Sequence, residues 1–506
     1  MTVARLFAGS PMVGLLCLIS IGGALIVGLA KGLPARPWWL AAFGFSLALA
    51  VAAVELRQEY PVGTPHAFPR AFATNHLRNF NLTESLIVGQ NLLKGRGNTL
   101  PVADGTTKID TYRMPGYALF VALAGVIFHV PADDLERLGA STVYLQVMFF
   151  AAAVAFLACS LPRSVPAGIA ALLVAATCWF PQAFDLTQVD SIILACGLLI
   201  TGSLCRFDTD ADVSEIPFRY HLLVHAAFGL YLTMRSDVLV GWIGVSLFLY
   251  RRRLRYMALP LAVALTIGSV WGLYKKAHGS DFVMTTSNVG HVAFVGLWQT
   301  PHHKFIWEPT DESYLRWISA HGYTYMEPRA NTFAIREVAR FWLTYPGFLI
   351  ANVANKAYAY VVANVWSGPL ALPPSRWAGT AMRRFVYWVF LLAVAGSLAT
   401  GFEARRTFLF GWPIVLNLPL FLVLQWNERY VAFVSCSIMF AAVPLLARRE
   451  FYRRMAAIKS ALIVLLVVAC VLRLSGPIIF RSVLSDRFRY WAPLIDPRSS
   501  TLNVLK

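Results

Sequence analysis

Three carboxylates stand near the edges of apolar segments, where they could activate a polar substrate. Asp190 opens one apolar segment, while Glu84 and Asp110 lie in the polar stretch 55–115. A carboxylate beside a hydroxyl group can remove its proton and so turn a poor nucleophile into a good one. The catalytic candidates are Asp190, Glu84 and Asp110, with Glu55 and Glu59 as weaker alternatives.

Each carboxylate also has a purely structural interpretation. Asp190 can cap a helix, because an acid is favoured at a helix N-terminus. Asp110 can pair with Arg113, three residues later, and Glu84 can lie on the solvated face of a helix. Residue type and spacing leave both interpretations open for all three.

Basic side chains at similar positions are candidates for holding a phosphate group. Charges at a membrane edge are costly, so they usually have a function. Cations also neutralise the negative charge that grows as a bond to phosphate breaks. Arg235 has a structural alternative, an ion pair with Asp237. The candidates are Arg113, Arg235, Lys275, Lys276 and Arg429.

No metal site or disulfide framework is expected. His302 and His303 are adjacent, but no third ligand stands at helical spacing from them, so a solvated loop is the better interpretation. The seven cysteines lie in or beside apolar segments and form no CxxC pair. No cofactor is predicted, and the sequence leaves a divalent metal open.

The composition indicates that the elements carrying these residues are membrane helices. The chain is 58% hydrophobic and 14% charged, with a mean hydropathy of +0.59, whereas soluble proteins are typically about 45–50% apolar and about 25% charged. Backbone polar groups in lipid must bond within their own segment, and no alternation typical of a barrel is present. The predicted fold is all-α, a polytopic bundle of transmembrane helices.

Fourteen apolar segments are candidate spans. Seven of them lie between the polar stretches 55–115 and 274–344, and an even number must cross if both stretches lie on one side. A short segment such as 116–130 or 220–234 must then be partial, and 345–366 can lie at the interface. We expect about 11–14 real crossings. The candidates are 12–30, 38–54, 116–130, 140–160, 166–181, 188–204, 220–234, 237–250, 256–273, 345–366, 383–400, 405–424, 429–447 and 458–480.

Basic loops predict the orientation. The net charge of +18 comes largely from short loops, which is the positive-inside pattern and not a nucleic-acid signal. The basic side chains should face the cytoplasm and attract anionic lipids weakly. The long stretches 55–115 and 274–344 should then face the periplasm, with the protein in the cytoplasmic (inner) membrane. The loops concerned carry Lys31, Arg36, Arg251–Arg255, Arg405–Arg406 and Arg448–Arg454.

The first polar stretch contains a predicted surface helix. Leu82, Leu86 and Leu93 fall on one helical stripe, while Glu84 and Asn91 fall opposite it. Gly95 and Gly97 supply the stop. Such a helix can lie flat on a membrane with its polar face in water.

Six short motifs follow one another along the chain. They are Leu92-Leu93-Lys94-Gly95-Arg96-Gly97, Tyr112-Arg113-Met114-Pro115-Gly116-Tyr117, Trp179-Phe180-Pro181 with Asp190, Thr233-Met234-Arg235, Trp271 with Lys275-Lys276, Gly279 and Ser287, and Glu428-Arg429-Tyr430. In their order and their common side they resemble the motifs of the GT-C-type glycosyltransferases, in the branch of the protein O-mannosyltransferases and lipid A aminoarabinose transferases. The resemblance covers roughly residues 38–450.

The resemblance implies a GT-C fold whose extracytoplasmic loops carry amphipathic helices. It also implies transfer of a sugar from a polyprenyl-phosphate-sugar donor to an envelope glycan, lipid or protein acceptor, with Glu428, Arg429 and Tyr430 among the substrate-binding residues. The sequence departs from the pattern at Asn81, near where the family usually carries an aspartate. Asparagine cannot accept a proton, so another carboxylate would have to act.

Four regions of the chain are expected, and two alternative functions stay open beside the glycosyltransferase. Residues 1–37 form an N-terminal helix and turn, 38–273 the catalytic membrane module, 274–344 the second periplasmic loop and 345–506 the C-terminal helices. A transporter or flippase of lipid-linked substrates is the first alternative, although no internal repeat is visible. An inactive scaffold of the same fold is the second.

Overall fold

The computed structural model describes residues 37–59, 80–101, 107–111, 113–161, 189–207, 213–297, 311–324 and 327–344, with isolated positions in 170–178, 346–356, 423–424 and 456–467. The first expected span at 12–30 and the expected segments beyond 366 lie outside these residues, apart from isolated positions, as does Glu428–Tyr430.

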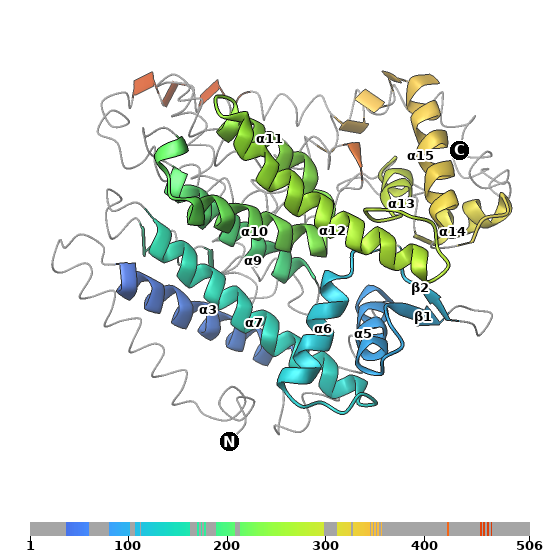
Figure 1. Ribbon diagram of the computed structural model, residues 1–506, viewed down its shortest axis with the longest axis horizontal. Helices are drawn as coiled ribbons and strands as arrows, with labels where there is room; N and C mark the ends of the chain where they lie inside the picture. The colour runs from blue at the N-terminus through green and yellow to red at the C-terminus, as the bar shows by residue number, and fades with distance from the viewer. Residues whose placement is uncertain are drawn as a thin grey trace.

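Apolar helices form the larger part of the described structure. Helix α3 packs against α7, α7 against α9, α9 against α10, and α10 against α11 and α12. Helices α3, α7, α10 and α12 run side by side across Figure 1. The bounds are α3 Pro37–Glu59, α7 Leu135–Ser160, α9 Asp190–Leu204, α10 Phe218–Met234, α11 Val238–Tyr250 and α12 Ala258–Ala277.

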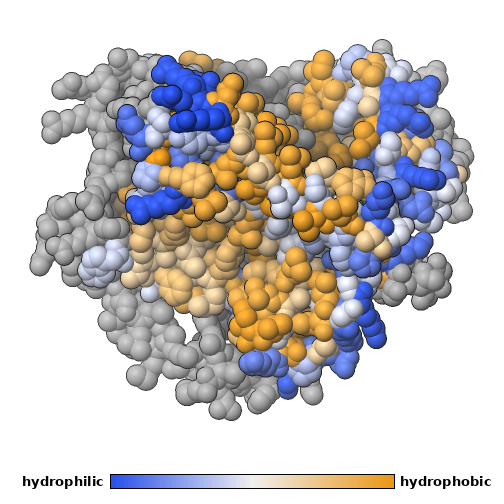
Figure 2. All heavy atoms as spheres, in the orientation of Figure 1, coloured by the Kyte–Doolittle hydropathy of each residue, from blue (hydrophilic) through white to orange (hydrophobic). Residues whose placement is uncertain are grey.

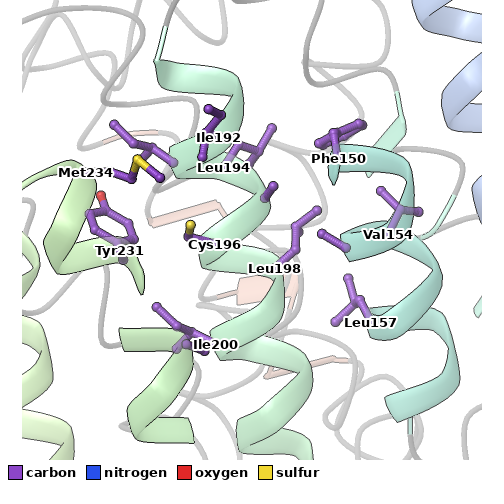
Figure 3. Close-up of a cluster of buried hydrophobic side chains, with 14 of the residues drawn as sticks. Phe150, Val154, Leu157, Ile192, Leu194, Cys196, Leu198, Ile200, Tyr231 and Met234 are labelled. Atoms are coloured by element: carbon purple, nitrogen blue, oxygen red, sulfur yellow. The ribbon is translucent and has the colours of Figure 1, made fainter. Parts of the chain in front are cut away.

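Side chains from both sides of α9 fill the core between these helices. Phe150, Val154 and Leu157 of α7 face α9 from one side, and Tyr231 and Met234 of α10 face it from the other (Figure 3). All five are buried. An apolar helix covered on two faces explains why the α9 sequence is almost continuously hydrophobic, with little amphipathic pattern.

Within the described residues, two helices are long and apolar enough to cross a membrane, Leu135–Ser160 and Leu254–Ala277. Four further apolar helices are shorter. The shortest is α6, Gly116–Ile127, whose 12 residues extend about 18 Å against about 30 Å of hydrocarbon. The expected span at 116–130 is therefore too short in the structure to cross by length alone.

Large apolar side chains are exposed in a band on the surface. Figure 2 shows them over α6, α11 and α12, between hydrophilic groups at the two ends. Exposed apolar patches of this extent are unusual on soluble monomers and mark contact with lipid or another protein. The residues include Leu119, Leu123, Val126, Ile127, Val240, Ile243, Leu247, Leu261, Leu265, Val270 and Leu273.

The first polar stretch folds as a helix followed by a small hairpin. Helix α5 spans Phe80–Leu93, and strands β1, Thr99–Pro101, and β2, Thr107–Ile109, pair antiparallel with Thr99 opposite Ile109. After α5, Gly95 has φ +71°. The N–H of Gly95 bonds to Leu92 O, and that of Arg96 bonds to Asn91 O, which is the Schellman helix stop. The predicted stop is confirmed, while the hairpin was not foreseen.

The solvated polar face expected for α5 is wrong. Glu84 and Asn91, which fall on that face, are buried together with Leu86. Helix α5 packs against α6, α7 and β1, so it has neighbours on both its apolar and its polar side. Polar residues opposite an apolar stripe therefore meet protein here.

The second polar stretch begins as an extended segment after α12. It continues as three helices, α13 Val289–Gly296, α14 Asp311–Ala320 and α15 Pro328–Thr344. They surround a separate aromatic core in which Phe294, Tyr314 and Trp317 are buried. Short 3-10 turns complete the described elements, η2 Cys205–Phe207, η3 Val213–Glu215 and η4 Leu254–Met257.

Candidate functional site

The two polar stretches meet at the C-terminal end of α12. The backbone N–H of Asn98, just before β1, donates to the hydroxyl of Tyr274 on α12 at 2.8 Å. The N–H of Ser287, in the segment after α12, donates to Thr111 O at 3.1 Å. Figure 1 shows the hairpin beside this end of α12. Residues far apart in the sequence therefore form one polar region at the end of the bundle.

Asp110 lies at the centre of this region, one residue beyond β2. Its N–H donates to Asn98 O at 3.0 Å, and the Asn98 amide donates back to Asp110 O at 3.2 Å. The N–H of Arg113 donates to Asp110 Oδ1 at 3.3 Å. Burial raises the pKa of the Asp110 carboxyl, and the charges of Arg113 and Lys275 oppose that rise in part.

Glu84 reaches the same region from α5. It forms an ion pair with the Arg113 guanidinium, and its side chain is only 8% exposed against 21% for Arg113. Arg113 therefore joins the two carboxylates, since its side chain pairs with Glu84 and its backbone binds Asp110. A charge pair this buried needs near-complete pairing to be tolerated.

Lys275 supplies the second buried cation. The side chain is fully buried, its ammonium donates to Thr285 O at 2.8 Å, and it lies 5.0 Å from the centre of the Trp271 ring. An ammonium carries three donors, so one carbonyl uses one of them. The adjacent Lys276 is exposed. Burial in the structure therefore distinguishes two lysines that the sequence alone could not tell apart.

The turn between α10 and α11 closes another side of the region. Arg235 pairs with Asp237 at 3.0 Å, which is the structural alternative expected for it. Between them, the Ser236 hydroxyl lies 3.0 Å from that of Thr286. Arg235 therefore borders the polar region, although its charge has a local partner.

The structure describes less of the other catalytic candidates. Asp190 begins α9, and the first turn of that helix lies beside Met234 in Figure 3, at the end of the bundle that carries Arg235. The side chain of Asp190 lies outside the described residues, as do those of Glu55, Glu59 and Asn81. The structure thus brings together Glu84, Asp110, Arg113 and Lys275 and leaves Asp190 at the same end.

Residue patterns gave no indication of several members of this region. Asn98 follows the predicted helix stop, and Tyr274 and Thr285 lie between the residues of a motif without belonging to it. Their contacts depend on a hairpin and an extended segment that meet through backbone hydrogen bonds. Among the described residues, no three potential metal-ligating side chains of the His, Cys, Asp and Glu types form a group.

The arrangement combines two carboxylates and two cations with little access to water. It can bind an anionic group through Lys275 and Arg113 while a nearby carboxylate accepts a proton. Low solvent exposure strengthens both interactions. Comparison with protein-family models, with curated proteins and with solved structures finds no match.

Proposed function

We propose that this protein is a membrane glycosyltransferase. It would move a sugar from a polyprenyl-phosphate-sugar donor to an envelope glycan, lipid or protein acceptor at the outer face of the cytoplasmic membrane. The observation that carries the proposal is the buried group of Glu84, Asp110, Arg113 and Lys275 at the end of an apolar bundle. A lipid-linked phosphate is the kind of anion that reaches such a position through the bilayer.

The proposed chemistry assigns a role to each of these four residues. Lys275 and Arg113 bind the phosphate as the bond between the sugar C1 and the phosphate oxygen breaks. The acceptor oxygen forms the new bond to C1, and its proton passes to Asp110. Glu84 orients Arg113 through their ion pair. A base is most effective when its pKa lies near the working pH, and the raised pKa of Asp110 favours it for this task over an exposed carboxylate.

Asp110 also offers a carboxylate in place of the one missing at Asn81. It follows α5 after two short strands, and it lies on the same side of the bundle as Glu84, to which Arg113 connects it. Asp190 remains a candidate for the same role because its helix begins at this end. Activity measurements on Asp110→Asn and Asp190→Asn would distinguish them, and general-base removal should cost about 10²-fold or more in rate.

A matched pair of lysine variants tests the phosphate site. Lys275→Met should lower donor turnover by about 10²-fold or more, because a charge-assisted contact in a dry site is worth about 2–4 kcal/mol. Lys276→Met should stay near wild type, because Lys276 is exposed. The readout is release of polyprenyl phosphate from radiolabelled donor in native membranes. Movement of intact donor across the bilayer without release would instead indicate a transporter.

Cysteine labelling tests the proposed orientation. The hairpin and residue 281 lie at one end of α12, and Arg251–Arg255 lies at the other, about 30 Å away along 20 residues. In a variant without native cysteines, Lys108→Cys and Asp281→Cys should react with an impermeant maleimide from outside. Arg252→Cys should not react until the membrane is opened, and labelling of all three from the same side would reject the orientation.

A further inference from the structure

Three buried polar atoms close to the Asp110–Lys275 region have no hydrogen-bond partner among the described residues. They are Asn98 Oδ1, Trp271 Nε1 and Ser287 Oγ. The exposed fractions of these residues are 3%, 4% and 3%. Buried polar atoms are nearly always hydrogen-bonded, so a group of orphans needs a ligand or bound water to explain it.

The three residues belong to three parts of the chain that meet around Asp110 and Lys275. Asn98 belongs to the hairpin and bonds to Asp110 through its amide N–H. Trp271 belongs to α12, where its ring lies 5.0 Å from the Lys275 ammonium. Ser287 belongs to the segment after α12, where its N–H bonds to Thr111, two residues beyond the carbonyl that binds Lys275. Each is therefore in direct contact with Asp110, Lys275 or the residue next to them.

The chemistry of the three atoms differs from that of a phosphate site. Asn98 Oδ1 can only accept, because the amide N–H group is already donating to Asp110 O and fixes the orientation of the side chain. Trp271 Nε1 can only donate, and Ser287 Oγ can do both. An ionised phosphate offers acceptors alone and leaves Asn98 Oδ1 unsatisfied. Hydroxyl groups, which donate and accept, match all three.

We propose that Asn98, Trp271 and Ser287 bind the hydroxyl groups of the donor sugar, beside the phosphate held by Lys275. This inference depends on the proposed glycosyltransferase function and names the part of the donor that these residues recognise. The class of ligand is a neutral polyhydroxylated ring, since the three atoms include no charge. An ammonium, which only donates, would leave Trp271 Nε1 unmatched, and a carboxylate, which only accepts, would leave Asn98 Oδ1 unmatched.

Conservative variants separate the sugar contacts from the phosphate contacts. Trp271→Phe removes the N–H and keeps an aromatic ring, and Ser287→Ala removes the hydroxyl alone. Binding to protein in lipid nanodiscs would be measured for two probes of equal chain length, polyprenyl phosphate and a polyprenyl-phosphate hexose. Each variant should weaken hexose binding about 3- to 10-fold, the effect of one neutral hydrogen bond, and leave polyprenyl phosphate unchanged. Lys275→Met should weaken both probes.

Other outcomes would overturn the inference in distinguishable ways. Equal weakening of both probes would assign Trp271 and Ser287 to packing. Hexose binding could stay unchanged in both variants while Lys275→Met still weakens binding of both probes. That result would mean that only water binds to the three polar atoms, and it would leave the proposed phosphate site intact. Failure of wild-type protein to bind either probe would reject the proposed function and the inference together.

A set of monodeoxy donors provides a second measurement. Wild-type protein should bind at least one monodeoxy hexose donor about 3- to 10-fold more weakly than the parent hexose, because removing the recognised hydroxyl removes one bond. The variant that lacks the partner of that hydroxyl should bind the two donors equally. A loss of the same size in wild type and both variants would show that the hydroxyl is recognised elsewhere and would overturn the assignment.

Discussion

Of the two glycines that follow α5, Gly97 should tolerate substitution less well, and Gly95 provides its control. Both have positive φ, +75° and +71°, so alanine at either position is strained by about 1–2 kcal/mol. A Cβ at Gly95 would meet nothing within 4 Å, whereas one at Gly97 would lie 2.5 Å from the Tyr274 hydroxyl. The difference between the two variants therefore isolates the contact with α12.

The size of that difference follows from the bond that would be displaced. The Tyr274 hydroxyl accepts from the Asn98 N–H at 2.8 Å, and a hydroxyl that moves away leaves this backbone donor without its partner. An unsatisfied buried donor costs about 1–3 kcal/mol. Gly97→Ala should therefore lower the free energy of unfolding by about 2–5 kcal/mol, and Gly95→Ala by only about 1–2 kcal/mol.

The assay is reversible unfolding in mixed micelles of mild detergent and dodecyl sulfate, with Tyr274→Phe protein as a second background beside wild type. Without the hydroxyl, the Asn98 N–H has already lost its partner, so Gly97→Ala should cost no more in Tyr274→Phe protein than Gly95→Ala costs in wild type. The reasoning is refuted if Gly97→Ala and Gly95→Ala destabilise the wild-type protein equally. It is also refuted if the Tyr274→Phe background leaves the extra cost of Gly97→Ala intact.

Two further predictions concern pH and helix packing. Burial raises the pKa of Asp110, so the folded protein holds this proton more tightly than the unfolded chain. The free energy of unfolding should then fall as pH rises from about 4 through the raised pKa, and pH titration of Asp110→Asn should lack this part of the slope. At Gly116, a Cβ would overlap the backbone oxygen of Thr233, whereas at Gly125 it would lie 2.6 Å from the flexible end of Leu93. Gly116→Ala should therefore destabilise by about 3 kcal/mol or more and Gly125→Ala by about 1 kcal/mol, and equal losses in the same unfolding assay would contradict this.

Hydropathy predicted the helices well because an apolar run of sufficient length has few alternatives. Helices α7, α9, α10, α11 and α12 appear where segments were expected, with ends shifted by a few residues. The crossing of a membrane was harder to predict, because α6 and α11 are helical and apolar yet only 12 and 13 residues long. Composition reports what surrounds a helix, whereas only its length tells whether it can span.

Burial of the polar side chains was the part that sequence could not supply. The stripe of leucines left open whether Glu84 faces water or a site, but the opposite side of α5 meets protein, and Glu84 pairs with Arg113. Periodicity locates a helix face without identifying its neighbour. Lys275 and Lys276 likewise differ only in the direction in which their side chains leave α12. The packing of α12 against the segment at Thr285 decides which of the two is buried.

The short α11 has a consequence for the membrane placement that we propose. Its 13 residues reach about 20 Å from Arg251 to the Arg235–Asp237 turn, while α12 extends about 30 Å over 20 residues. In a bilayer of ordinary thickness, that turn would lie about 10 Å inside the hydrocarbon layer. Leaflets that thin around the turn would relieve this hydrophobic mismatch. The proposed lipid-linked donor, diffusing in the membrane, would then meet the polar region from the side, through a local depression in the leaflet. Shorter-chain lipids should make this depression shallower, because their bilayer is thinner and the mismatch with α11 is smaller.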